Sequence, residues 1–296
     1  MRRADRKAMT VTTSAVVDQV HLGDHICWAH EDDSDGLDAA GRFVAAGLRL
    51  GHKALWFTDA IAPSAARDHL DSRGVPTRAA LAGGQLRIVA AEEAYAGSGR
   101  FTPEAMIDTL AAEADRSRRE GYPGLRMVGD MGWALRHRAS PADLCRYEAE
   151  VNRLFIDGHT AGMCLYDRRL FPSEYLVPVT TAHPATVGPR TGRAWTPLLR
   201  AYRTRDPHGL RLIGEIDRSN RGAFTAMLDH VTGEATNERT TVLDVSELSF
   251  ADVGAATALA RARRNAPSAV RLVGCRPALS RLLDLVDGTA RAGGVA

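Results

Sequence analysis

The chain has little of what marks membrane, secreted or nucleic-acid-binding proteins. Its 296 residues include only two lysines, and the formal net charge is +2, which creates no field to attract nucleic acid or an anionic membrane. No stretch approaches the roughly 18 consecutive apolar residues of a transmembrane helix. The basic N-terminus is not followed by the apolar run of a signal peptide. We therefore expect a soluble cytoplasmic protein that contacts neither membranes nor nucleic acid.

Cysteine is sparse. Four cysteines could form two disulfides, but no secretory context favours them. The four cysteines, which form no CxxC pair, are Cys27, Cys145, Cys164 and Cys275. One short segment still has the residue types of a metal site, namely His21, His25, Cys27 and His30. Cys164 and His183 could complete four zinc ligands if the fold brought them near. Packed cysteines beside hydrogen-bonded histidines are commoner, so we predict no metal and no other cofactor.

Short apolar runs alternate with longer amphipathic segments in the first two thirds of the chain. The apolar runs are 25–29, 54–58, 86–90, 125–130 and 161–167, and the amphipathic segments are 35–51, 64–74, 102–121 and 141–155. Because parallel strands need helical crossovers, this order predicts an α/β domain with a mostly parallel sheet. We place this domain at 21–186 and a linker rich in Pro, Gly and Thr at 187–195. Residues 1–20 and 289–296 are expected to be disordered.

The remaining segment, 196–288, reads as a second, smaller α/β domain. We expect strands at 197–204, 210–217 and 240–244, and helices at 220–230, from about 254, and after Pro277. This order, with Gly-Glu-Ile-Asp at 214–217 and Phe-Ala-Asp at 250–252, resembles the STAS domain of bacterial anti-anti-sigma factors. The resemblance implies that the domain binds a protein partner, an anti-sigma factor, through Asp252, Val253 and Gly254.

The loop at 250–255 differs from the STAS family pattern at the position that is phosphorylated in other members. In STAS domains it commonly reads Phe-x-Asp-Ser-Ser-Gly, and the second serine accepts phosphate at a helix N-terminus. Val253 and Gly254 stand where the serines would be, and glycine cannot be phosphorylated. We therefore expect control from elsewhere in the chain. A dimerisation module or a stressosome-like scaffold is the alternative.

The N-terminal domain resembles the MEDS family, a sensory domain of methanogen and methylotroph regulators. The stretches that carry the resemblance are 21–32, 43–59, 125–136, 147–155, 164–171 and 183–184. The resemblance implies small-molecule sensing, with hydrocarbon derivatives as suggested ligands. Open α/β sheets bind ligands at the carboxyl ends of their strands. The ligand-binding residues expected there are His25, Cys27, Glu31, Asp130, Trp133, Tyr166, Asp167 and Arg168. Glu148, Asn152 and Arg153 are expected on the solvated face of helix 141–155.

The order of elements is also similar to a degenerate RecA/KaiC-type ATPase. However, the loop at 30–36 holds four carboxylates and no lysine, so it would repel a triphosphate. No GxSxG motif or ordered Ser-His-Asp set is present. We therefore expect a non-enzymatic, ligand-sensing regulator whose STAS domain antagonises an anti-sigma factor. A degenerate P-loop ATPase is a less favoured alternative, and homo-oligomerisation is left open.

Overall fold

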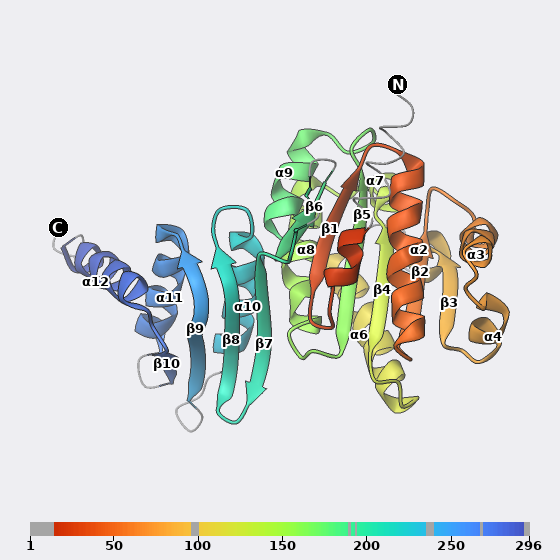
Figure 1. The fold of residues 1–296 in the computed structure, drawn as a ribbon. Coiled ribbons are helices and arrows are strands. Elements are labelled where there is room, and N and C mark those ends of the chain that lie inside the picture. The colour runs from red at the N-terminus through yellow and green to blue at the C-terminus, as the bar shows by residue number, and fades with distance from the viewer. Residues whose placement is uncertain are drawn as a thin grey trace.

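Two separate β-sheets organise the chain, and each is covered by its own helices (Figure 1). The computed structural model describes residues 15–95, 101–188, 191–192, 194–234, 240–266 and 269–292. The predicted α/β class is confirmed, with a larger N-terminal domain and a smaller C-terminal one. None of the helices in these ranges is long and apolar enough to span a membrane.

The N-terminal sheet has six strands in the order β3-β2-β4-β5-β1-β6, and every neighbouring pair is parallel. The strands are β1 (His25–His30), β2 (Lys53–Thr58), β3 (Leu86–Ala90), β4 (Leu125–Asp130), β5 (Thr160–Asp167) and β6 (Ala185–Val187). Five of them match the predicted apolar runs. The sixth, β6, was not predicted, because three residues at the start of a Pro- and Gly-rich stretch give no periodic signal.

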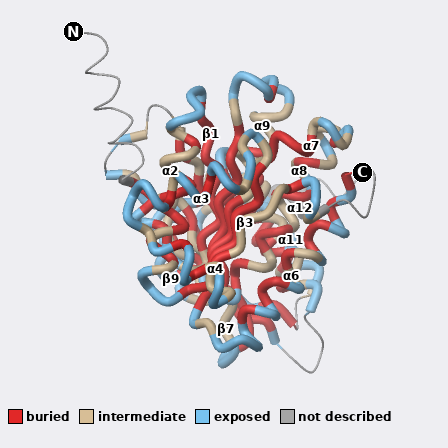
Figure 2. Tube along the Cα trace, turned by 90° about the vertical axis from the view of Figure 1, so that its right-hand side faces the viewer, coloured by how far each residue is buried: buried red, intermediate tan, exposed pale blue. Residues whose placement is uncertain are grey.

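Helices cover both faces of this sheet, which is why β1 and β2 are buried along their whole length. One face packs against η1 (Ala15–Gln19), α2 (Asp33–Arg49), α3 (Pro63–Ser72) and α4 (Thr77–Ala82). The other face packs against α6 (Pro103–Arg119), α7 (Gly132–Arg136), α8 (Pro141–Glu150) and α9 (Ser173–Thr181). Two short helices complete the domain, α5 (Ala91–Tyr95) and η2 (Val151–Leu154). Figure 2 shows the strands as the buried centre and the exposed residues on the outer loops and helices.

Two terminal segments are more ordered than expected. Residues 15–20 lie within the stretch predicted to be disordered, yet they include the helix η1. Val16, Val17 and Val20 are buried against α2, so their apolar side chains account for the difference. At the other end, α12 (Pro277–Ala292) continues beyond 288. The rest of the predicted disordered ends, 1–14 and 293–296, lies outside the described residues.

The C-terminal domain is built on a four-stranded sheet in the order β10-β9-β8-β7. Its strands are β7 (Leu199–Arg205), β8 (His208–Ile216), β9 (Thr241–Ala251) and β10 (Val270–Val273), with only β7 and β8 antiparallel. A single core lies between this sheet and α10 (Arg221–Gly233), α11 (Val253–Asn265) and α12. The third predicted strand was placed at 240–244, but β9 is longer, because two register irregularities allow its pairing with β8 to continue to Ala251.

The two domains are joined by specific polar and packing contacts. Arg200 on β7 donates from Nε to Oδ1 of Asp24 at 2.8 Å and from Nη2 to Oδ2 at 3.0 Å. The backbone N–H of Arg203 donates to the carbonyl of Ile156 at 2.6 Å. Ile156, from the N-terminal domain, is buried in the C-terminal core. The chain therefore holds its two domains in a defined arrangement.

Replacing Arg200 with Ala should lower the free energy of unfolding. Asp24 is 3% exposed, and its carboxylate would lose two charge-assisted donors, which costs about 1–3 kcal/mol. Urea unfolding followed by circular dichroism measures the difference. Arg205→Ala, at an exposed position of the same strand, is the matched control and should change stability by less than about 0.5 kcal/mol. Equal losses in both variants would contradict the assigned role of the Arg200–Asp24 pair.

Candidate functional site

A group of buried polar side chains lies between the N-terminal sheet and α8. Its members are His25 on β1, Glu148 on α8, Cys164 on β5 and His183 just after α9. All four are buried, and each offers one imidazole nitrogen, carboxylate oxygen or sulfur atom within 4.8 Å of the others. We call this group the buried donor cluster. It joins four segments that are far apart in the sequence.

Hydrogen bonds fix the tautomers of both histidines in this cluster. The Asn152 amide nitrogen donates to the carbonyls of Glu148, Ala149 and Ala182 at 2.8–3.0 Å. Its Oδ1 is therefore the acceptor 3.0 Å from His25 Nδ1, so this nitrogen carries the proton. His183 Nδ1 likewise donates to a backbone carbonyl at 2.7 Å. Both Nε2 atoms are consequently left as lone-pair acceptors inside the cluster.

Burial sets the charge states of the cluster. Burial, and then the neighbouring His183, lower the pKa of His25 to about 3, so this imidazole is neutral at neutral pH. Burial raises the pKa of the Cys164 thiol well above its ordinary value. Burial opposes ionisation of Glu148, but His183, His25 and the Tyr166 hydroxyl hold the pKa of this carboxyl below its ordinary value. The cluster therefore places a fully buried carboxyl group beside two imidazoles and a thiol.

A small apolar cavity of about 30 Å³ lies next to the cluster. His25 and Cys164 form its polar side, and its apolar side comes mainly from Phe57, Met106, Leu110, Met127, Met131, Trp133, Tyr147, Val151, Phe155 and Met163. Its volume holds about two water-sized groups. Methionine side chains adapt readily to a guest, so a small, largely apolar molecule is the kind of ligand that this cavity could take.

The eight predicted ligand-binding residues fall into two groups. His25 and Trp133 line the cavity, Tyr166 donates to Glu148, and Cys27 is buried in the same core cluster as Trp133 and Tyr166. The other four, Glu31, Asp130, Asp167 and Arg168, lie at the carboxyl ends of β1, β4 and β5.

These four strand-end residues have partners of their own. Arg168 pairs with Glu31 at 3.0 Å, and both side chains are exposed. Asp167 accepts from Arg169 at 2.8 Å, and Asp130 accepts from the backbone N–H groups of Ala60 and Gly132 at 2.8 and 3.1 Å. The structure thus does not gather the eight residues into one site, and the assignment of all eight as ligand-binding stays a prediction.

The expectation that Glu148 and Asn152 face solvent was wrong. Their exposures are 0% and 1%. The sequence did contain the signal, because Leu144, Glu148 and Val151 recur at the four- and three-residue spacing of one helix face. Position on the helix, and not residue type, decides the burial of these two side chains.

The predicted partner face of the C-terminal domain lies at the start of α11. Asp252 caps this helix, because its Oδ1 accepts from the N–H of Ala255 at 2.8 Å, and its other oxygen pairs with Arg221. Val253 is 61% exposed and Phe250 is 51% exposed. At Gly254 a Cβ atom would lie 2.5 Å from the Arg221 guanidinium carbon. Glycine therefore permits the contact between Arg221 and Asp252.

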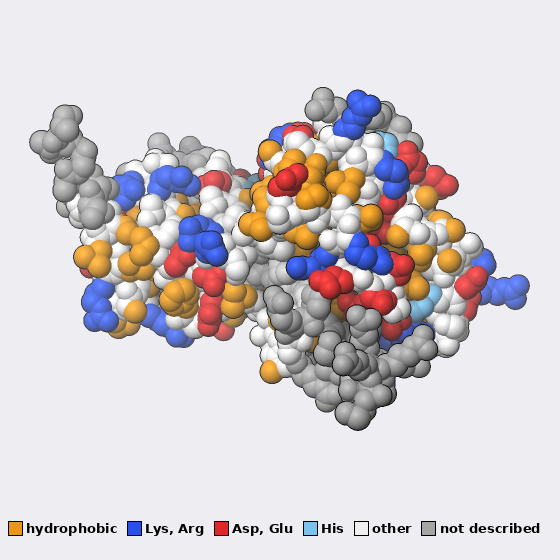
Figure 3. All heavy atoms as spheres, turned by 90° about the horizontal axis from the view of Figure 1, so that it is seen from above, with side chains coloured by type: hydrophobic (Ala, Val, Ile, Leu, Met, Phe, Trp, Pro, Cys, Tyr) orange, Lys and Arg blue, Asp and Glu red, His pale blue; other side chains and the backbone are white. Residues whose placement is uncertain are grey.

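An apolar groove of about 300 Å³ adjoins this face. Its apolar lining consists of Leu248, Phe250, Ala251, Ala278, Leu279, Leu282 and Leu285. Figure 3 shows hydrophobic side chains exposed on this domain, at the left of the view, among arginine and acidic side chains. Exposed apolar surface of this kind is typical of a protein-binding site.

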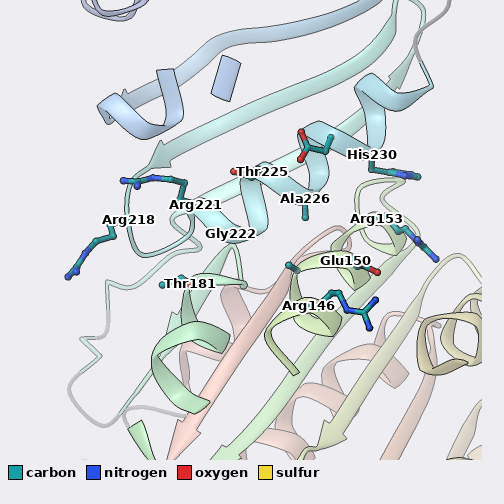
Figure 4. A pocket seen from close by; sticks show the side chains of 12 residues that line it. Arg146, Glu150, Arg153, Thr181, Arg218, Arg221, Gly222, Thr225, Ala226 and His230 are labelled. Atoms are coloured by element: carbon teal, nitrogen blue, oxygen red, sulfur yellow. The ribbon is translucent and has the colours of Figure 1, made fainter. Parts of the chain in front are cut away.

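A third hollow, of about 810 Å³, lies at the junction of the two domains (Figure 4). Its ionisable side chains are Arg146, Glu150, Arg153, Arg218, Arg221, Asp229 and His230. They come from α8 and η2 on one side and from α10 and the residues before it on the other. At the close contact of the junction, Gly222 lies against Thr181, whose carbonyl oxygen would be 2.8 Å from a Cβ atom.

Comparison with known proteins agrees with both domain assignments. The family model for the methanogen/methylotroph DcmR sensory domain, MEDS, matches residues 24–184. The model described as Mlab, STAS domain, matches residues 200–288. The transcriptional repressor DcmR of Methylorubrum extorquens is 29% identical over 168 residues, which are 55% of this chain and 59% of that protein. The chain thus spans less than two thirds of that relative's length.

Two solved structures show weaker likeness. The flagellar accessory protein FlaH from Methanocaldococcus jannaschii aligns with a TM-score of 0.45 at 10% identity, covering 75% of this chain and 88% of that one. An uncharacterized protein from Pyrococcus horikoshii, solved with an unknown peptide, aligns with a TM-score of 0.44 at 15% identity, covering 64% and 82%. The family match covers more than half of the chain, and the chain therefore belongs to the MEDS family of sensory domains, here followed by a STAS domain.

Proposed function

We propose that this regulator senses a small apolar molecule in its MEDS domain and thereby controls the binding of an anti-sigma factor to its STAS domain. It acts by binding and not by catalysis. The observation that carries the proposal is the position of α8 and η2, which contact both the buried site and the C-terminal domain.

The inner side of this segment belongs to the buried site. Glu148 is part of the donor cluster, Asn152 hydrogen-bonds to it, and Val151 lines the apolar cavity. A ligand that enters the cavity therefore contacts the segment directly. Because packed interiors are poorly compressible, such a contact shifts a helix as a unit and does not merely deform it locally.

The outer side of the same segment faces the STAS domain. Glu150 and Arg153 line the junction hollow opposite α10 (Figure 4), and Ile156 is buried in the C-terminal core. Arg221, at the start of α10, pairs with Asp252 on the partner face. A shift of the segment is thereby passed through α10 to the residues that we assign to partner binding.

The chemistry of the STAS face supports a protein partner. Phe250 and Val253 expose apolar surface beside a groove of leucines, and Asp252 adds a carboxylate. The likeness to anti-anti-sigma factors favours an anti-sigma factor. Gly254 offers no hydroxyl that could be phosphorylated. In this proposal, ligand binding in the MEDS domain therefore takes the place of phosphorylation in controlling partner binding.

Val253→Asp should weaken the complex with the cognate anti-sigma factor at least tenfold, which corresponds to about 1.4 kcal/mol. A charge would be placed in an apolar contact at an exposed residue that contributes little to folding. Isothermal titration calorimetry against the anti-sigma factors of the source organism measures the affinity. Leu50→Asp, which alters an equally exposed apolar residue in the other domain, is the control and should leave affinity unchanged.

Two outcomes would contradict the anti-sigma assignment. One is that none of these anti-sigma factors binds the wild-type chain. The other is that sedimentation shows stable self-association which Val253→Asp abolishes. In the second case the apolar groove of the STAS domain would mediate self-association, as expected of a scaffold protein.

Gly129→Ala should abolish ligand binding without destabilising the fold. Gly129 lines the cavity, and an added Cβ would meet only the Met131 sulfur, at 3.6 Å. The probes are short-chain alcohols, aldehydes and haloalkanes, tested by thermal shift. A ligand at 100 times its Kd should stabilise the wild-type chain by about 2.7 kcal/mol. Gly188→Ala, where a Cβ meets nothing within 4 Å, should keep the shift. An unchanged shift in Gly129→Ala would place the ligand elsewhere.

A further inference from the structure

We propose that the buried donor cluster is a metal site, in which His25, Glu148, Cys164 and His183 bind one divalent transition-metal ion, with Zn²⁺ as the best fit. This inference is independent of the proposed anti-sigma partner. It also departs from the sequence-based expectation that the chain binds no metal, which rested on the neighbouring set of His21, His25, Cys27 and His30.

The spacing of the donor atoms matches a closed coordination sphere. A tetrahedral zinc ion with bonds of about 2.0–2.3 Å separates its ligand atoms by about 3.3–3.7 Å. In the cluster, His25 Nε2 lies 3.3 Å from Cys164 Sγ and 3.5 Å from Glu148 Oε2. Glu148 Oε2 lies 3.3 Å from His183 Nε2 and 3.5 Å from Cys164 Sγ. The remaining two pairs, from His183 Nε2 to the donor atoms of His25 and Cys164, lie within 4.8 Å.

The outer contacts are those that orient metal ligands. Each histidine is held through Nδ1, by Asn152 in one case and by the Val179 carbonyl in the other, so each Nε2 lone pair is free to coordinate. The Tyr166 hydroxyl donates to the second oxygen of Glu148, which leaves Oε2 for the ion. His183 Nε2 is fully buried and has no hydrogen-bond partner. Coordination would satisfy this atom.

The charge of the cluster also calls for a cation. Glu148 is fully buried, and among the described residues no lysine or arginine pairs with it. A bound cation is one way to compensate the burial of a carboxyl group. When a divalent ion binds, the thiol of Cys164 loses its proton to solvent and the metal–sulfur bond forms. One carboxylate and one thiolate then neutralise the two positive charges of the ion.

The ligand types favour zinc among the common ions. Imidazole and thiolate suit Zn²⁺, whereas Mg²⁺ and Ca²⁺ prefer an all-oxygen shell. Four protein ligands leave no position for a reacting water, so the site is structural or sensory and not hydrolytic. The ion would tie α8 to β1, β5 and the residue that follows α9.

The first test measures metal in the full-length wild-type chain. The protein is purified from zinc-supplemented medium, and its metal content is measured by inductively coupled plasma mass spectrometry. We expect one equivalent of zinc per chain. The chelator-treated protein is then titrated with Co²⁺, which should produce a thiolate-to-cobalt charge-transfer band and the intense visible bands of a tetrahedral site.

Two cysteine variants assign the sulfur ligand. Cys164→Ser should lose the charge-transfer band. Cys27→Ser should keep it, because Cys27 pairs in register with Cys164 on the adjacent strand but is not a member of the cluster. His183→Gln should weaken cobalt binding at least tenfold. Circular dichroism confirms that each variant is folded.

Three results would overturn the proposal. One is a folded wild-type chain that carries no transition metal above background and gives no cobalt bands. The second is cobalt bound without a thiolate band, which would place the ion outside the cluster. The third is a band that is lost in Cys27→Ser but kept in Cys164→Ser.

Discussion

The burial of the Glu148 carboxylate is the constraint on which the rest of the arrangement depends. The carboxyl group of Glu148 has no exposure, and it lies in contact with His25, His183 and Tyr166. They fix the rotation of α8 about its axis. Once Glu148 faces inward, Glu150 and Arg153 must face outward, where they line the junction with α10. One buried carboxylate therefore sets the relation between the core of the sensory domain and the surface on which the second domain rests.

The position of the candidate site differs from that common in open parallel sheets. Such sheets usually bind ligands outside the carboxyl ends of their strands. In this chain the strand ends carry surface ion pairs such as Glu31–Arg168, which contribute little stability. The cavity and the donor cluster instead lie between the sheet and one helix layer. A ligand enclosed there is in contact with the helix that leads to the second domain, whereas a ligand at the strand ends would not be.

The main strands could be predicted from the sequence because a buried parallel strand is a short run of apolar residues. Positions 54–58 and 125–130 gave this signal directly. The strand β6 could not be predicted, since three residues carry no period. The helix α9 was also not predicted, and it contains Pro178, a residue that disfavours helix interiors. Of the residues predicted for the site, His25 and Trp133 line the cavity, although His25 begins β1 and so lies at the opposite end of the strand from the one expected. Glu148 and Asn152 were missed because charged and amide side chains are mostly exposed, and only the contacts of the folded chain show that these two are satisfied inside.

The contact between Gly254 and Arg221 limits how this STAS domain can change in evolution. A residue with a side chain at 254 would displace the guanidinium group of Arg221 from Asp252. Arg221 also lines the domain junction, so the same substitution would alter the cap of α11 and the edge of that junction at once. A variant with serine at this position would acquire a hydroxyl group and a changed domain contact in one step. Modification at the partner face and the packing of the two domains are therefore not independent traits in this chain.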